Sequence, residues 1–505
     1  MAQEPPAADL VILNARVWTV DRERPEAEAV AVLGERIVSV GSNDQVKAWR
    51  GPRTRVIDAG GLRLLPGFND AHVHFANGGR QLDKVNLKDA ATPEEFVRRI
   101  AEQVEKTPRG EWVLGGNWDH ENWTPVELPT RHMIDGVSPT TPVFVSRYDG
   151  HMALANSAAL RLATVTAQTP DPPGGVIVRD AKGQPTGALK DAAMGYVQRV
   201  IPPKTREQRT RAIRRALAHA RSLGVTSVQE MYSEYEDFAI YAQLAEAGEL
   251  PVRIYAVPAL ATWDRLALIG VRRAFGSTFL RTGALKESSD GSLGSTTAYF
   301  FDPYNDAPET RGLLGPGMHP ISRVRGRMLE ADAAGLQLCI HAIGDQAIST
   351  VLDLFEDVIR ANGPRDRRLR IEHAQHMATK DFDRFAAQHV IASMQPYHAI
   401  DDGRWAEKRI GAERIQTTYA FRTFLDHGVR LAFGTDWPVA PLDPLQGIYA
   451  AVTRATLDGK HPDGWVPKEK ISVAEAVEAY TLGSAYAEFQ DQDKGSITPG
   501  KLADL

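Results

Sequence analysis

Four histidines, one lysine and one aspartate occupy short motifs that each follow an apolar run of the chain. They are His72 and His74 in PGFNDAHVHF, Lys286 in GALKESSDGS, His341 in LCIHAIGD, His373 in RIEHAQ and Asp436 in LAFGTDWP. Imidazole and carboxylate groups are the usual protein ligands of zinc and similar divalent metals. A metal with one open position lowers the pKa of its water to ~7 and so supplies hydroxide at neutral pH. A nearby carboxylate can take the remaining proton and later give it to a leaving amine.

Each of these residues also has an ordinary structural explanation. A single histidine at the end of a strand is often a polar cap or a core group with satisfied hydrogen bonds. Asp436, which precedes Trp-Pro, could simply start a turn. The prediction of a metal site therefore rests on the position that these residues share, at the same end of successive elements.

Lys286 needs its own explanation, because an ammonium group repels metal cations. Burial and nearby cations lower the pKa of a lysine, so that its neutral amine becomes accessible. The neutral amine can react with carbon dioxide to form a carbamate, whose two oxygens can bridge two metals. Alternatively, Lys286 remains an ammonium ion and pairs with Glu287 or Asp290. The residues alone do not decide between these two interpretations.

Alternating strands and helices would position these motifs. Eight short apolar runs follow one another, and segments with apolar residues at three- and four-residue spacing separate the later ones. The runs are LRLLPGFNDAH, VTSVQEM, VRIYAVP, RTGALKE, LQLCIHA, LRIEHA, VIASMQPY and VRLAFGTD. Gly224, Gly335 and Gly428 follow helical segments, as is typical of helix ends. This pattern predicts an α/β fold, a (β/α)8 TIM-like barrel, whose strands carry working residues at their carboxyl ends.

We expect the barrel to occupy residues 66–485, with a long insertion after its first strand at about residues 76–200. Residues 1–65 show the alternation and turns of β structure, and residues 486–505 look similar. The two chain ends are therefore predicted to form a small β-sandwich. Because the chain stops at KLADL, within a predicted strand, we expect the C-terminal part of this sandwich to be incomplete.

The insertion carries three candidate substrate contacts, His151, Asn156 and Trp118. His151 and Asn156, in DGHMALANS, could bind a carbonyl group or line the pocket. His151 could instead cap a helix that begins at ALANSAAL. Trp118, together with Trp123, could form an apolar wall for the substrate or pack within the subdomain.

Three further candidates lie near the expected mouth of the barrel. Asp290 follows Lys286 in a glycine-containing loop, close enough to influence the site. Tyr397 and His398 end the seventh strand and could orient a scissile carbonyl group. We therefore include all three among the predicted substrate-binding residues.

Together these motifs resemble the amidohydrolase superfamily of metal-dependent hydrolases. PGFNDAHVHF, HAIGDQA, IEHAQ and FGTDWPV match its signatures in order. LKESSDGSLGS and the long insertion are similar to the amidohydrolase-3 branch, which includes N-substituted formamide deformylases. The resemblance covers essentially the whole chain. It implies a deformed barrel beside a β-sandwich, with one or two divalent metals, usually zinc.

Carried onto this chain, the resemblance implies two metal positions. His72 and His74 would hold the first metal with Asp436, and His341 and His373 would hold the second. Lys286, as N6-carboxylysine, would bridge them. Asp436 would also shuttle the proton, so Asp436, Lys286 and His341 are the predicted catalytic residues.

The predicted activity is hydrolysis of a C–N bond other than a peptide bond, in a small amide, formamide or related molecule, by metal-activated hydroxide. The tryptophans suggest a substrate with a hydrophobic or aromatic part. The same site could instead hydrolyse an ester, a carbamate or a lactone, or catalyse a non-hydrolytic decarboxylation. A non-enzymatic metal-binding protein is a third hypothesis, which the full set of ligands disfavours.

Composition argues against several other classes. The formal net charge of −5 gives no general attraction to nucleic acid or anionic membranes. No apolar run approaches the ~20 residues that span a bilayer. The single cysteine, Cys339, excludes an intrachain disulfide. The start, MAQEPPAADL, lacks a signal region, so we expect a soluble protein, either cytoplasmic or, after signal removal, periplasmic or secreted. A homodimer is compatible with the sequence.

Overall fold

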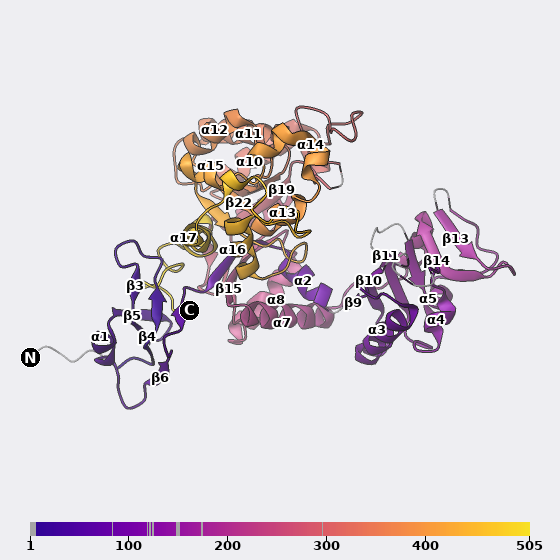
Figure 1. Ribbon diagram of the computed structural model, residues 1–505, viewed down its shortest axis with the longest axis horizontal. Coiled ribbons are helices and arrows are strands. Elements are labelled where there is room, and N and C mark those ends of the chain that lie inside the picture. The colour runs from indigo at the N-terminus through magenta and orange to yellow at the C-terminus, as the bar shows by residue number, and fades with distance from the viewer. Residues whose placement is uncertain are drawn as a thin grey trace, which may run out of the picture. The chain divides into compact units, whose positions relative to one another are not determined.

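The computed structural model (Figure 1) describes residues 7–82, 84–118, 120, 123, 126–147, 152–172, 175–294 and 296–505. The chain forms two compact units. The main unit comprises Met1–Ala76 and Ala216–Leu505, and the inserted unit comprises Asn77–Arg215. None of the described helices combines the length and the apolar character needed to cross a membrane.

Each of the eight apolar runs contains residues of a strand of the main unit, and RTGALKE contains residues of two, β18 and β19. The strands are β8 (Phe68–Val73), β15 (Val225–Met231), β16 (Arg253–Val257), β18 (Leu280–Thr282), β19 (Ala284–Ser288), β20 (Gln337–Ala342), β21 (Arg370–His373), β22 (Ile391–Met394) and β23 (Leu431–Phe433). They form two five-stranded sheets, β17-β18-β16-β15-β8 and β19-β20-β21-β22-β23. All their pairings are parallel except that of β17 (Phe275–Gly276) with β18. Parallel strands that alternate with helices make this an α/β fold of the TIM-barrel type.

Backbone hydrogen bonds connect the two sheets at two places. At one, the amide of Lys286 in the edge strand β19 donates to the carbonyl of Pro258, directly after the inner strand β16, at 2.8 Å. At the other, the amide of Asp436 donates to the carbonyl of His72 at 2.7 Å, and that of His74 to Trp437 at 2.8 Å. The carboxyl ends of β8 and β23 therefore lie side by side.

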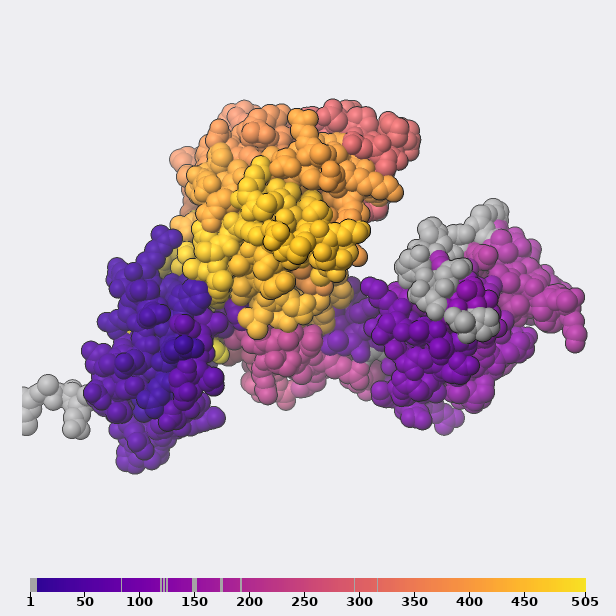
Figure 2. All heavy atoms as spheres, in the orientation of Figure 1, coloured from indigo at the N-terminus to yellow at the C-terminus, as the bar shows by residue number. Residues whose placement is uncertain are grey.

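Helices follow most of these strands. The longer ones are α7 (Arg206–Ser222), α8 (Tyr235–Glu246), α10 (Ile321–Ala333), α11 (Asp345–Asn362) and α16 (Pro444–Thr453). The shorter ones are α2 (Phe75–Leu82), α9 (Trp263–Leu268), α12 (Phe382–Ala387), α13 (Pro396–Asp402), α14 (Ala406–Arg414), α15 (Phe421–Asp426), α17 (Val473–Glu478) and α18 (Ser484–Ala487). Gly224, Gly335 and Gly428 follow α7, α10 and α15 with positive φ, as helix-ending glycines do. In Figure 2, residues near the C-terminus, drawn in yellow, lie in the middle of the face of the main unit that is turned toward the viewer.

The N-terminal residues form two small sheets. The first is β5 (Arg36–Gly41), β4 (Ala29–Leu33), β1 (Leu10–Leu13) and β6 (Arg55–Asp58), in that order, and the second is β3 (Glu26–Ala27), β2 (Arg16–Trp18) and β7 (Arg63–Leu64). The short helix α1 (Asn43–Lys47) follows β5. The end of the chain lies beside β5 (Figure 1), where the amide of Ile37 donates to Lys501 and that of Ala503 donates to Glu35. Ile497 packs with Ile37 and Val17, so both chain ends contribute to one apolar cluster.

The inserted unit contains a six-stranded sheet, β13-β14-β12-β11-β10-β9. Its strands are β9 (Val85–Asn86), β10 (Val113–Trp118), β11 (Val143–Arg147), β12 (Met152–Ala155), β13 (Gly175–Arg179) and β14 (Pro185–Asp191), and its helices are α3 (Pro93–Lys106), α4 (Arg131–Asp135), α5 (Ser157–Leu162) and α6 (Gly195–Gln198). Consecutive residues of β11 enter different apolar clusters, Val143 and Val145 one and Phe144 the other. Because strand residues alternate between faces, the sheet has an apolar cluster on each side.

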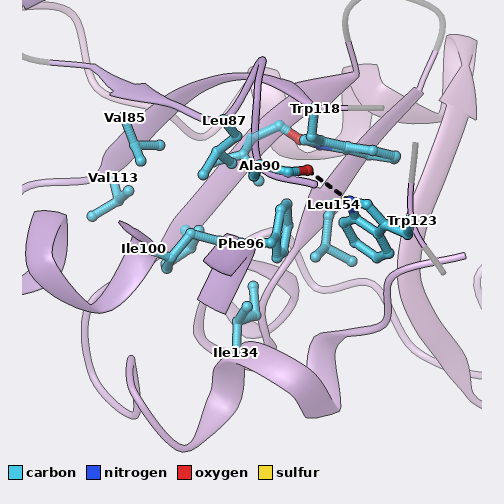
Figure 3. Close-up of a cluster of buried hydrophobic side chains, with 12 residues drawn as sticks. Val85, Leu87, Ala90, Phe96, Ile100, Val113, Trp118, Trp123, Ile134 and Leu154 are labelled. Atoms are coloured by element: carbon cyan, nitrogen blue, oxygen red, sulfur yellow. Dashed lines mark hydrogen bonds between the residues drawn. The ribbon is translucent and has the colours of Figure 1, made fainter. Parts of the chain in front are cut away.

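The first of these clusters surrounds Phe96 (Figure 3). The ring of Phe96 meets those of Trp118 and Trp123 edge-on, with centroids 6.3 Å and 5.3 Å apart. Trp123 donates its indole N–H to the carbonyl of Ala90 at 3.0 Å. The cluster combines α3 with the sheet and forms one core of the inserted unit.

We predict that Phe96→Ala destabilises the inserted unit by about 3–5 kcal/mol, because it leaves a cavity among packed aromatic rings. Urea unfolding followed by tryptophan fluorescence measures the change. Leu268→Ala, at a side chain that is 87% exposed, is the control and should change stability by less than about 0.5 kcal/mol. Equal midpoints for both variants would contradict the packing described here.

Candidate metal centre

The predicted ligands lie at the carboxyl ends of the strands of the main unit. His72 belongs to β8 and His74 follows it, while the buried Val73 between them points the other way. Lys286 is in β19, and Asp436 comes just after β23. His341 and His373 are in β20 and β21, and His398 lies in α13, directly after β22. The alternation of strands and helices thus brings distant segments of the sequence to the same end of the sheets.

Asp436 is the residue on which these side chains converge. Its Oδ1 lies 3.3 Å from Nε2 of His74 and 3.6 Å from Nε2 of His72. Its Oδ2 lies 4.0 Å from Nε2 of His398. The ring of His373 is 4.7 Å from that of His72, centroid to centroid.

Two groups of side chains in the described part of the chain could hold a metal ion. One is His72, His74 and Asp436, and the other is His373, His398 and Asp436. Within each group the potential ligand atoms lie within 4.8 Å of one another. The first group is the predicted first metal position, whereas the second includes His398, which the sequence indicated as a substrate contact.

In three of the histidines, one ring nitrogen contacts a protein oxygen. The other ring nitrogen of each is then available for a metal. Nδ1 of His72 lies 2.7 Å from Oε2 of Glu372, and Nδ1 of His373 lies 2.7 Å from Oε1 of Gln395. Nε2 of His341 lies 3.0 Å from the carbonyl oxygen of Gly291. Because these oxygens accept hydrogen bonds, each contacting nitrogen carries the proton and the other nitrogen keeps its lone pair. This is the arrangement that metal-binding histidines require.

Among the described residues of the two candidate metal groups, Oδ1 of Asp436 and Nε2 of His398 are buried without a hydrogen-bond partner. Buried polar atoms are nearly always satisfied, so unsatisfied ones call for an explanation. A divalent cation and a polar substrate group at this position would supply the missing interactions. The residues present therefore fit a metal site.

Burial determines the protonation of these groups. It lowers the pKa of His72 to about 4 and that of His373 well below its usual value. Burial alone would raise the pKa of Asp436, but the adjacent His74, together with His72 and His398, holds that pKa below its usual range. At neutral pH His72 and His373 are therefore neutral and the carboxylate of Asp436 is ionised, as metal ligands must be.

Lys286 is 2% exposed, and burial lowers the pKa of its ammonium group. The ammonium nitrogen lies 5.8 Å from the centroid of the Tyr232 ring. Among the described residues, no carboxylate lies within ion-pairing distance of it, so the predicted alternative of a pair with Glu287 or Asp290 is not seen. A buried lysine without such a partner favours the neutral amine.

The predicted contact Asp290 holds backbone groups around His341. Its carboxylate accepts from the amides of Ile343, Gly344 and Tyr299 at 2.8–3.0 Å, at the start of α11. It also lies 3.3 Å from Nε2 of His341. These bonds place Asp290 behind a candidate ligand as a positioning group.

Two predicted contacts of the inserted unit are fully buried within it. Asn156 is 0% exposed, and its Oδ1 accepts from Val143 and Ala159 while its Nδ2 donates to Ser138. Trp118 is also 0% exposed and donates its indole N–H to Val145 at 2.9 Å. The structure thus supports the packing alternative for Trp118, whereas Asn156 caps α5, a role that the sequence suggested only for His151.

Two of the remaining predicted contacts, Tyr397 and His398, lie next to each other at the start of α13. Tyr397 is half-buried. The ring of His398 stacks on that of His373, with an interplanar angle of 14°. His151 lies outside the described residues.

Sequence reasoning missed Glu372, Gln395 and the neighbouring Arg370. Arg370 and Glu372 are 0% exposed, on a strand whose apolar character suggested an ordinary core element. The sequence did contain one indication of a polar group in the core. Arg370 and Glu372 are charged, and because they are two residues apart on a strand they share one face. Gln395 gave no comparable signal.

Comparison with known proteins adds independent information. Residues 55–505 match the model of the amidohydrolase family. The chain belongs to the amidohydrolase family. It is accordingly a hydrolase that acts on C–N bonds other than peptide bonds.

Several relatives extend along nearly the whole chain. Protein LONG AFTER FAR-RED 3 of Arabidopsis thaliana is 39% identical, with 99% of this chain and 88% of that protein covered. An N-substituted formamide deformylase of Arthrobacter pascens is 30% identical, with 98% and 92% covered. The crystal structure of an uncharacterized metal-dependent hydrolase from Pyrococcus furiosus has a TM-score of 0.80 at 28% identity, with 98% and 97% covered.

We predict that His72→Ala lowers the metal content of the purified protein, because it removes one imidazole from the group around Asp436. Elemental analysis after dialysis against zinc measures the content per chain. His427→Ala is the control, since His427 is partly exposed and pairs with Asp383 rather than with any candidate ligand. Unchanged metal content in His72→Ala would remove His72 from the site.

We also predict that acid destabilises the metal-free protein through His376. Burial lowers the pKa of His376 to about 3 from the usual 6.5. Between these values the unfolded chain binds a proton that the folded chain does not, so this contribution to stability falls as the pH drops from 6.5. The urea midpoint of His376→Gln, measured from pH 7 to pH 4, should fall less than that of the wild type. Parallel curves would refute this assignment.

Proposed function

We propose that this enzyme is a metal-dependent amidohydrolase that cleaves the C–N bond of an amide, formamide or related group in a small molecule. The observation that carries the proposal is the convergence of His72, His74 and His398 on the carboxylate of Asp436. Family membership supports the reaction class, and the similarity to an N-substituted formamide deformylase supports formamides as the first substrates to test.

We assign the ligands as follows. His72, His74 and Asp436 would hold the first divalent metal, and His341 and His373 would hold a second, while Lys286 as N6-carboxylysine would supply further oxygen ligands. Zinc is the metal we propose, because imidazole and carboxylate ligands suit it. The burial of Lys286 and its lowered pKa support the carbamate.

We also propose the corresponding architecture. The two five-stranded sheets are parts of one (β/α)8 barrel over residues 66–485, and residues 1–65 and 486–505 form the small β-sandwich. The hydrogen bonds of Lys286 with Pro258 and of Asp436 with His72, which connect the two sheets, support the barrel.

A metal at this site supplies a Lewis acid for the scissile carbonyl group and a water of lowered pKa. Asp436 accepts a proton from the attacking water and delivers it to the departing nitrogen. His398, whose Nε2 has no partner among the described residues, donates a hydrogen bond to the carbonyl oxygen of the substrate. Tyr397, beside it, contacts the remainder of the substrate.

The test is a panel of matched N-formyl and N-acetyl amines and the corresponding esters, offered to zinc-loaded enzyme with products identified by mass spectrometry. We predict release of amine from at least one formamide or amide, and a loss of about 10²–10⁴-fold in kcat for Asp436→Asn. Turnover of esters alone, with no amine released, would replace the proposed reaction by ester hydrolysis.

We predict that Lys286→Ala abolishes activity and that a short carboxylic acid, such as propionate, partly restores it. The acid would supply the two oxygens that the carbamate provides. Intact mass after gentle handling should show carbon dioxide added to the wild type and absent from Lys286→Ala. A wild-type mass without the addition, in fully active metal-loaded enzyme, would exclude the carbamate.

A further inference from the structure

The side chain behind His72 is a buried carboxylate that no part of the proposed reaction uses. Oε2 of Glu372 lies 2.7 Å from Nδ1 of His72, and both side chains are at most 1% exposed. Strand pairing places Glu372 of β21 opposite Ser393 of β22 and His341 of β20, inside the polar centre of the sheet. The contact therefore joins two segments that are far apart in the sequence.

Glu372 is in turn held by Arg370, two residues earlier on the same face of β21. Nε of Arg370 lies 2.8 Å from Oε1 of Glu372, in ion-pair contact although not aligned as a hydrogen bond. The guanidinium group also donates to Oε2 of Glu372 at 3.2 Å and to Oγ of Ser393 at 3.1 Å. Both residues are 0% exposed.

Arg370 also contacts the strand that carries His72. Its Nη2 donates to the carbonyl of Ala71 at 2.7 Å, and its Nη1 donates to the side chain of Gln229 on β15. The guanidinium thus fixes the backbone just before His72, while the carboxylate fixes the imidazole of His72. One ion pair holds both parts of the same residue.

We propose that Glu372, supported by Arg370, is a positioning residue that sets the tautomer and orientation of His72 for metal binding. This inference rests on the proposed metal centre. With its proton on Nδ1, His72 presents the lone pair of Nε2 toward Asp436, from which Nε2 lies 3.6 Å. A carboxylate behind a metal-binding histidine also makes that imidazole a stronger ligand.

A purely structural ion pair is the competing explanation. Breaking a buried pair costs stability wherever it lies, because one charge is left uncompensated. Such a pair would not change the affinity of the folded protein for a metal. Metal affinity therefore separates the two explanations, and stability does not.

The experiment measures zinc binding to metal-free protein by competition with a chromophoric chelator, without substrate. We expect Glu372→Gln to raise the zinc dissociation constant about 10–100-fold. The matched control is Asp332→Asn, since Asp332 is also buried, at 1% exposed, and pairs with Arg367 at 3.0 Å. The control should lose stability but keep the zinc affinity of the wild type.

If Glu372→Gln does not fold, Glu372→Asp is the second test variant. The shorter aspartate keeps the negative charge but withdraws the carboxylate from Nδ1 of His72. It too should bind zinc more weakly than the wild type. A folded variant at Glu372 that binds zinc within about threefold of the wild type would overturn the proposal. The zinc-binding measurement involves no substrate, so its result does not depend on the amide panel. Absence of turnover in the amide panel would contradict the proposed reaction but not the role of Glu372.

Discussion

Hydrogen bonds between the end of β8 and the segment after β23 determine how His72, His74 and Asp436 lie relative to one another. The amide of Asp436 donates to the carbonyl of His72, and the amide of His74 donates to the carbonyl of Trp437. Next to them, the carboxylate of Asp70 accepts from the amide and the hydroxyl of Thr435 at 2.9 Å and 2.6 Å. Without these bonds, two imidazoles from one end of the chain would not face a carboxylate from the other.

This close approach also requires a glycine. A Cβ atom on Gly434 would lie 2.4 Å from the amide nitrogen of His72 and 2.7 Å from Oδ1 of Asp70. Real side chains do not tolerate such distances, so any larger residue would separate the two segments. Asp436, two residues further along, would then move away from His74. The backbone approach and the side-chain geometry therefore depend on each other.

Much of this arrangement could be predicted from the sequence, because periodicity and strand ends are local properties. The eight apolar runs contain strands, and the side chains of His72, His74 and Asp436 lie close together. The groups that orient them were not predicted, because Glu372 and Gln395 act on ligands from other parts of the chain. The packing of Trp118 and Asn156 was equally hidden, since an apolar wall of a pocket and an apolar core have the same composition.

The consecutive residues Glu372 and His373 show most clearly why the pattern alone was insufficient. In a regular strand they would point to opposite faces, yet Glu372 binds Nδ1 of His72 and the ring of His373 lies 4.7 Å from that of His72. His373 has a φ of +74°, in the left-handed region that non-glycine residues seldom adopt. Asp436, three residues after the end of β23, has a φ of +60°. Such backbone conformations cost about 1–3 kcal/mol each and persist where the surroundings enforce them. The positive φ of His373 therefore allows adjacent side chains to serve one centre, His373 as a candidate ligand and Glu372 as the support of His72.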